Sequence, residues 1–160
     1  MKRIVLTLLI LVCVFLAPVA AQDNGRAPEF FSFNLGVPLG FDLGVEEFAA
    51  GYNFTVSFAI LDNFSVGYDF ISVENGGAAA REFNSLRLGF LFNQNLGAAV
   101  SIGNEGTNSA LGLGLFTNLS RSTTAQGIKS SLYMRIDYFA TLDDFGDGAL
   151  LFATGISFGI

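Results

Sequence analysis

The sequence contains no histidine, no tryptophan and a single cysteine, Cys13, among its 160 residues. Without histidine, and without a second cysteine, the chain has no conventional Ser–His or Cys–His nucleophile pair and no usual zinc site. It also cannot form a disulfide within itself, so another kind of constraint must stabilise it. These absences predict a protein that is not an enzyme and that needs no cofactor.

Long apolar runs are equally scarce, and one stands out near the start of the chain. It extends from Ile4 to Ala17, follows Lys2 and Arg3, and ends at Pro18. A membrane-spanning helix needs roughly 20 apolar residues, and this run is shorter. The pattern predicts a secretory signal peptide over residues 1–21, with an uncleaved anchor as the alternative. Residues 22–160 then suit a single domain in an oxidising compartment.

Basic residues are also few: the chain has eight of them against fourteen acidic residues. Without Lys2 and Arg3, six basic residues remain and the net charge becomes −8. An acidic protein repels phosphate groups, so nucleic acids and acidic lipid head groups are unfavourable partners.

What the chain does have is strict alternation of large apolar residues with small or polar ones. In the run from Phe31 to Val45 every second residue is Phe, Leu or Val, and the residues between them include Ser, Asn, Gly and Asp. A period of two predicts extended strands with two different faces. Because Pro38 and Gly40 lie inside this run, it is either one strand or two strands divided by a turn.

The alternation recurs along the rest of the chain, and no part of residues 22–160 shows a helical period. Eight alternating segments are predicted at residues 31–45, 54–60, 64–70, 85–92, 96–102, 111–115, 128–138 and 150–160. The longer connections between them are predicted at residues 46–51, 74–82, 104–109, 120–126 and 141–148.

Alternation alone does not say which face points inward, since a soluble lipocalin-like barrel has the same period. Three features favour an outward apolar face. The other face is rich in Gly, Ser, Asn and Ala rather than Lys and Glu. The segments approach the 9 to 11 residues of a tilted membrane-crossing strand. The apolar face of every segment lacks charge, as expected where it contacts lipid.

Strands can span hydrocarbon only as a closed barrel without free edges. The sequence therefore predicts an all-β protein, a closed antiparallel up-and-down transmembrane barrel of about eight strands. Eight strands enclose an interior that side chains can fill. The charges of the small-residue face are then predicted to form a structural network in this lumen: Asp69, Arg87, Lys129, Arg135 and Asp137. Arg87 and Arg135 should pair with Asp69, Asp137 or Asp42, because an unpaired buried charge is costly.

One dense acidic group, Asp143, Asp144 and Asp147, lies in a glycine-containing connection. Phe145 stands where a calcium-binding loop would place its second oxygen ligand. The group is a weak candidate for a divalent cation and otherwise a solvated turn, so no metal site is predicted.

As an architecture, the mature chain resembles the small eight-stranded outer-membrane β-barrel proteins of diderm bacteria, of the outer-membrane protein X and W type. At the C-terminus, Gly155, Phe158 and Ile160 look like the assembly signal of such barrels, although many members end in Phe. The resemblance implies location in the outer membrane and recognition of the last strand by the barrel-assembly machinery. The enzymes among these barrels rely on a histidine, so their activity is not implied here.

Three hypotheses follow for the function. The first is a structural or interaction barrel of the outer membrane, in contact with lipid and with a filled, non-porin lumen. The second is a barrel that binds or passes a small hydrophobic ligand. The third is a soluble periplasmic lipocalin-like binding protein.

Overall fold

The computed structural model describes residues 30–76, 80–93, 95–124 and 127–160. The predicted signal peptide, with Cys13, lies outside the described residues. Among those that are described, no helix is long and apolar enough to cross a membrane.

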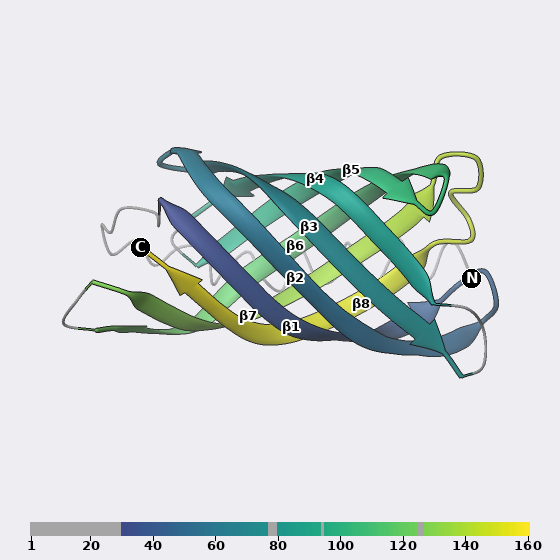
Figure 1. Ribbon diagram of the computed structural model, residues 1–160, viewed down its shortest axis with the longest axis horizontal. Helices are drawn as coiled ribbons and strands as arrows, with labels where there is room; N and C mark the ends of the chain where they lie inside the picture. The colour runs from purple at the N-terminus through teal and green to yellow at the C-terminus, as the bar shows by residue number, and fades with distance from the viewer. Residues whose placement is uncertain (1–29, 77–79, 94, 125–126) are drawn as a thin grey trace.

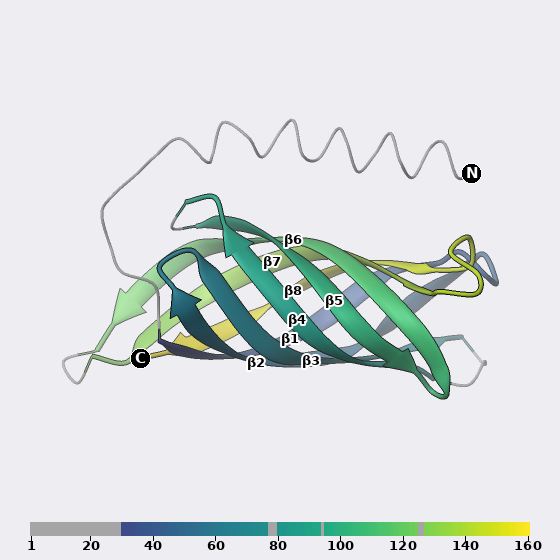
Figure 2. The same cartoon turned by 90° about the horizontal axis from the view of Figure 1, so that it is seen from above.

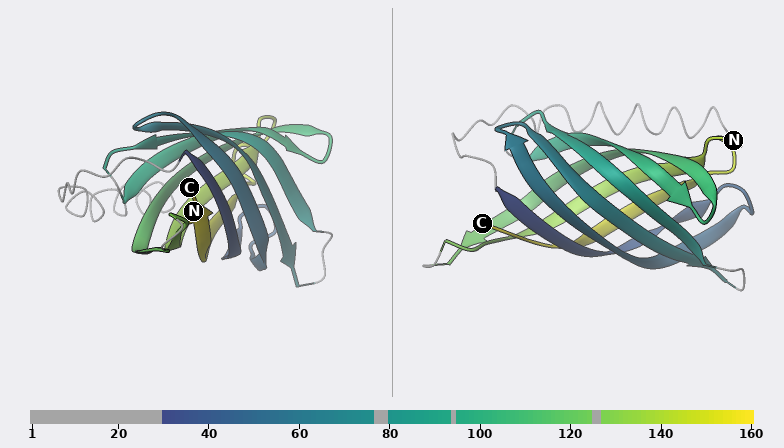
Figure 3. Two further views of the ribbon diagram at one scale, coloured as in Figure 1. Left: turned by 60° about the vertical axis from the view of Figure 1, so that its left-hand side comes forward. Right: turned by 45° about the horizontal axis from the view of Figure 1, so that its top comes forward.

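Eight antiparallel strands form a closed barrel in chain order, which confirms the predicted all-β, up-and-down antiparallel barrel (Figure 1). The strands are β1 (Phe31–Asp42), β2 (Glu47–Leu61), β3 (Phe64–Asn75), β4 (Arg81–Leu91), β5 (Leu96–Glu105), β6 (Asn108–Thr123), β7 (Lys129–Thr141) and β8 (Ala149–Gly159). Each strand pairs with its neighbours in the chain, and β1 closes the sheet by pairing with β8. The strands slope steeply around the barrel axis, as the two views of Figure 3 show.

The barrel has two ends that we name by what they carry. The terminal end holds Phe31 and Ile160, whose main chains exchange two hydrogen bonds of 3.3 and 3.1 Å. The loop end holds the connections that follow β1, β3, β5 and β7. At the terminal end the β6–β7 hairpin extends beyond the other strands, as Figures 1 and 2 show.

The first alternating run is a single strand that ends earlier than predicted. β1 stops at Asp42, and a turn of residues 43–46 leads into β2. Glu46 in this turn has a φ of 59°. Pro38 does not divide the strand, because its register with Ala153 of β8 is uninterrupted. The ladder toward β2 skips Val37 and Pro38, where proline lacks the N–H that a ladder bond needs.

Two predicted connections are shorter than expected because polar residues continue the strands. The predicted loop at 104–109 shrinks to Gly106 and Thr107, with Glu105 opposite Asn108 in the ladder. The predicted connection at 120–126 is mostly strand, since Ser120 to Thr123 pair with Leu132 to Lys129. A register shift between Asn118 and Ser120 precedes this extension. Main-chain hydrogen bonds between strands need no apolar side chain. A prediction that ends each strand where the residues become polar therefore ended these strands too early.

The apolar face of the sheet points outward. Large apolar side chains are exposed around the barrel, including Leu35 at 48%, Leu86 at 53% and Ile156 at 50%. The opposite parity is buried and carries most of the buried polar and charged residues: Asn53, Thr55, Asp69, Ser85, Arg87, Ser101, Ser131, Arg135, Asp137 and Ser157. This arrangement is the reverse of a lipocalin-like barrel, in which the apolar face would line the interior.

An apolar layer crosses the lumen toward the loop end. It consists of Ala49, Ile71, Val73, Phe83, Ala110, Phe139, Ala149 and Leu151, all of them buried. The rings of Phe83 and Phe139 lie with their centroids 5.0 Å apart. These side chains fill the section of the barrel between its charged centre and its loops.

Candidate functional site

The charged centre of the lumen is built from three strands, the consecutive strands β3 and β4 and the distant strand β7. Asp69 lies on β3, Arg87 on β4, and Arg135 and Asp137 on β7. Each has the parity that points inward, and each has a small or polar neighbour across the sheet, such as Ser85 opposite Asp69. The structure thus brings together four of the five charges that the sequence assigned to the network.

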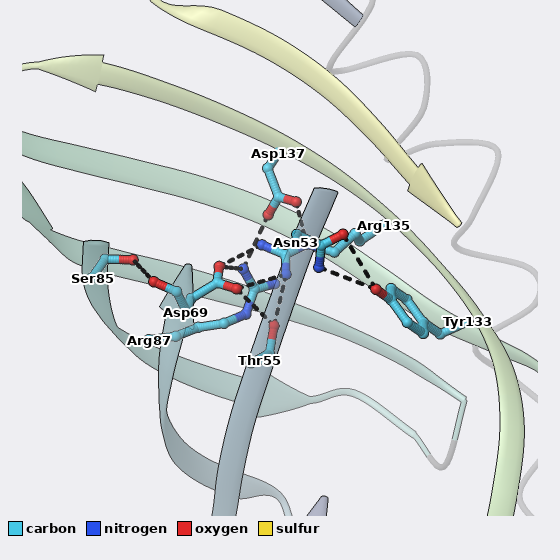
Figure 4. A network of polar contacts seen from close by, with 8 residues as sticks. All are labelled: Asn53, Thr55, Asp69, Ser85, Arg87, Tyr133, Arg135 and Asp137. Atoms are coloured by element: carbon cyan, nitrogen blue, oxygen red, sulfur yellow. Dashed lines mark hydrogen bonds and ion pairs between the residues drawn. The ribbon is translucent and has the colours of Figure 1, made fainter. Parts of the chain in front are cut away.

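The four side chains form a closed ring of ion pairs, shown in Figure 4. Arg87 Nη1 lies 3.2 Å from Asp69 Oδ2 and 3.1 Å from Asp137 Oδ1. Arg135 Nη2 and Nη1 lie 2.6 and 2.9 Å from the two oxygens of Asp69. The Nε of Arg135 donates to Asp137 Oδ2. Each arginine therefore bridges both aspartates.

Neutral side chains complete the hydrogen bonding around the ring. Thr55 donates to Asp69 Oδ1 at 2.6 Å and accepts from Arg135 Nη1 at 3.0 Å. Asn53 Nδ2 donates to the hydroxyl of Tyr133 at 3.1 Å. Ser85 donates to the main-chain oxygen of Asp69 at 3.5 Å.

The ring is deeply buried and electrically neutral. Asp69 is 0% exposed, Asp137 1% and Arg135 4%. Two guanidinium groups balance two carboxylates, so the lumen carries no net charge at this level. Removing one member of such a cluster leaves an uncompensated buried charge, which typically costs about 3–5 kcal/mol.

Lys129 and Asp42 lie elsewhere. Lys129 is the first residue of β7, opposite Gly159 and Thr123 at the terminal end, and is only partly buried. Among the described residues it forms no ion pair with the ring. Asp42 pairs with Arg81 at the loop end, at 2.7 Å, rather than with Arg87 or Arg135.

Glycines make room for the large side chains of the lumen. A Cβ at Gly114 would lie 2.1 Å from Asp137 Oδ1, and one at Gly97 would lie 2.4 Å from the Phe116 ring. A Cβ at Gly36 would lie 2.2 Å from the Tyr133 hydroxyl. The small-residue face is thus the space that the ring and the aromatic side chains occupy.

A cavity of about 130 Å³ lies between the ring and the terminal end. Its walls are mixed: Ser32, Asn34, Ser57 and Asn118 line it together with both ring arginines, and so do Leu61, Phe64, Leu91 and Phe116. Asp69 and Asp137 do not line it, because the arginines and Thr55 lie between the carboxylates and the cavity. The arrangement therefore presents donors to the cavity and no carboxylate that could act there as a base.

A second ionic cluster at the loop end was not predicted from the sequence. Arg81 donates to Asp42 at 2.7 Å and to the two oxygens of Glu105 at 2.5 and 2.8 Å. Arg81 and Glu105 lay in predicted loops, so their positions on strand ends were not foreseen. The available signal was that Arg81 is the one basic residue among the acids of the predicted connections 46–51, 74–82, 104–109 and 141–148.

The acidic group in the β7–β8 connection remains dispersed. Asp144 Oδ1 accepts a hydrogen bond from the main chain of Gly146, and Asp144 and Asp147 face a depression that Asp143 does not line. Within the described part of the chain, no three His, Cys, Asp or Glu side chains come together as a metal-binding group.

Comparison of the chain with family models, with curated proteins and with solved structures gave no match. The fold class is defined by the structure alone. It is a closed eight-stranded antiparallel barrel with a charged, largely filled lumen.

Proposed function

We propose that the protein is an integral outer-membrane β-barrel with a structural or interaction role and a filled, non-porin lumen. The observation that carries this proposal is the direction of the side chains. Exposed Leu, Ile, Val and Phe surround the barrel while two Arg–Asp pairs lie buried inside it. Water would favour the opposite arrangement, and hydrocarbon favours this one.

The closed sheet supports the same proposal. All eight strands have two hydrogen-bonded neighbours, so the wall of the barrel has no edge strand that would need water. Tyr52 and Tyr68 are exposed at 57% and 44% on the outer face, where aromatic side chains can contact the lipid interface.

The state of the lumen supports a role other than transport. The ring of ion pairs and the apolar layer with Phe83 and Phe139 lie in succession between the two ends. The cavity near the terminal end is small and is lined by polar as well as apolar side chains, so a wholly hydrophobic ligand would leave some of its polar groups unpaired. We therefore do not extend the proposal to a hydrophobic ligand, and we propose no catalytic activity.

The partners that we propose follow from this placement. Lipid acyl chains would cover the apolar belt, and the barrel-assembly machinery would act on β8, the strand that closes the sheet against β1. Nucleic acid is not a proposed partner, because the chain is acidic.

Cell fractionation combined with gel mobility tests the proposal. The protein is expected in the outer-membrane fraction, extractable only with detergent, and its unheated sample is expected to migrate differently from its boiled sample. A chain that stays monodisperse in buffer without any amphiphile would contradict the proposal.

A further inference from the structure

The charges of this protein are distributed very unevenly between its two ends. The loop end carries nine acidic residues: Asp42, Glu46, Glu47, Glu74, Glu82, Glu105, Asp143, Asp144 and Asp147. In the described part of the loop end, Arg81 is the single basic residue. The ring in the centre of the lumen is neutral, so nothing nearby offsets this negative charge.

A depression with a volume of about 720 Å³ opens at this end of the barrel. Its lining residues belong to the strand ends and connections of the loop end, which is the right-hand side of the barrel in Figure 1. Asp42, Asn75, Arg81, Glu105, Asp144 and Asp147 are among the residues that line it. Its size is within the range of roughly 300–1,000 Å³ that small-molecule sites occupy.

Arg81 does not neutralise the depression. Its guanidinium is already engaged by Asp42 and Glu105, and its Nη1 also donates to the main-chain oxygen of Asp147 at 3.2 Å. Within the described residues, the carboxylates of Asp144 and Asp147 have no cationic partner. The depression therefore holds two carboxylates with unmatched charge.

Asn75 provides an independent sign that a donor belongs in this depression. Its side chain is 3% exposed, and its Nδ2 donates to Asp42 Oδ2 at 2.6 Å. This bond fixes the orientation of the amide, because the opposite orientation would place two acceptors together. Its Oδ1 atom is buried and has no hydrogen-bond partner among the described residues. A buried acceptor without a partner is rare, and an N–H donor of a ligand would satisfy it.

We propose that this depression binds a linear organic polycation, a molecule with two or more ammonium groups on an aliphatic chain. One ammonium group would donate to Asn75 Oδ1, and another would lie between the carboxylates of Asp144 and Asp147. A compact metal ion fits less well, because the described acidic side chains do not converge as a ligand set and Arg81 occupies the middle of the cluster. The site lies at the strand ends and connections, so its ligand does not depend on what covers the apolar belt.

Calorimetric titration of the full chain in detergent micelles with spermidine tests the proposal, with magnesium chloride titrated at matched ionic strength. We expect saturable spermidine binding that is tighter than magnesium binding. Asp144→Asn and Asp147→Asn should each weaken spermidine binding by about two- to fivefold, the usual effect of one exposed charge pair. Asn75→Ala should weaken it as well, because the unpaired acceptor is removed.

Asp143→Asn is the matched control, because Asp143 is adjacent to Asp144 but does not line the depression. Its effect should be clearly smaller than that of Asp144→Asn. Gel mobility of unheated samples verifies that each variant is folded. The proposal is overturned if spermidine does not saturate, if Asp143→Asn weakens binding as much as Asp144→Asn, or if magnesium binds as tightly as spermidine.

Discussion

A methyl group on Gly114 would lie 2.1 Å from the Oδ1 atom of Asp137, which already accepts a hydrogen bond from Arg87. The two residues face each other across the β6–β7 pairing. The charged ring thus occupies the volume that a side chain at position 114 would need. Glycine is required there by lack of space rather than by backbone conformation.

Gly114→Ala should therefore destabilise the barrel. Displacing Asp137 strains its bonds to both arginines, and overpacking of this kind typically costs about 1–3 kcal/mol. Urea unfolding of the refolded protein in lipid vesicles measures the loss. Gly76→Ala is the control, since a Cβ there meets nothing within 4 Å. Equal stability of the two variants would contradict the crowding that we describe.

Arg135→Met should lower the free energy of unfolding by about 3–5 kcal/mol, because two buried carboxylates then share one guanidinium. Lys129→Met changes charge in the same way on the same strand, but Lys129 is not part of the ring. Its effect should stay within about 0.5 kcal/mol. Denaturant titration of both variants makes the comparison. A small loss for Arg135→Met would mean that water or lipid head groups compensate the carboxylates.

Val100→Lys tests the environment of the outer face. Val100 is 39% exposed and stands between Leu88 and Leu113 on the neighbouring strands. In a bilayer a lysine near the midplane costs about 2–4 kcal/mol. On a surface facing water the same change would stay within about 0.5 kcal/mol. Leu142→Lys in the β7–β8 connection is the control and should be tolerated, because this position lies outside the strands.

Tyr133→Phe should cost about 1 kcal/mol, since it removes the hydroxyl that pairs with the buried side chain of Asn53. Tyr52→Phe removes a hydroxyl from an exposed outer position and should have little effect. Thermal or urea unfolding of both variants in micelles provides the measurement. A similar loss for both would show that the hydroxyl of Tyr133 has no special role in the lumen.

The number of strands and the direction of their faces could be predicted from the sequence, because side-chain direction in a strand depends only on parity. That Asp69, Arg87, Arg135 and Asp137 point inward follows from the same rule. Which arginine bonds to which aspartate could not be predicted. It depends on the register between β3, β4 and β7, which are not all neighbours in the sheet.

The loop end was predicted less well, for a physical reason. Asp42 lay within the first predicted strand, but its neighbours in the cluster, Arg81 and Glu105, are polar residues at strand ends, where main-chain hydrogen bonds extend the ladder without any apolar pattern. Alternation cannot reveal such residues as strand, so their cluster and the depression beside Asn75 were missed. Lys129 was assigned to the ring for a different reason: parity shows which face of the sheet a side chain is on but not its height along the barrel.

The pairing of Phe31 with Ile160 has a consequence for chain connectivity. Because these two residues are hydrogen-bonded to each other, a short peptide could join them without disturbing any strand. New termini could then be opened at Gly106 and Thr107, which belong to no strand. The barrel should tolerate such circular permutation once it is folded, since a closed ring of strands has no structural beginning. The strands would be synthesised in a different order. A different strand would therefore be made first and would stay unpaired longest.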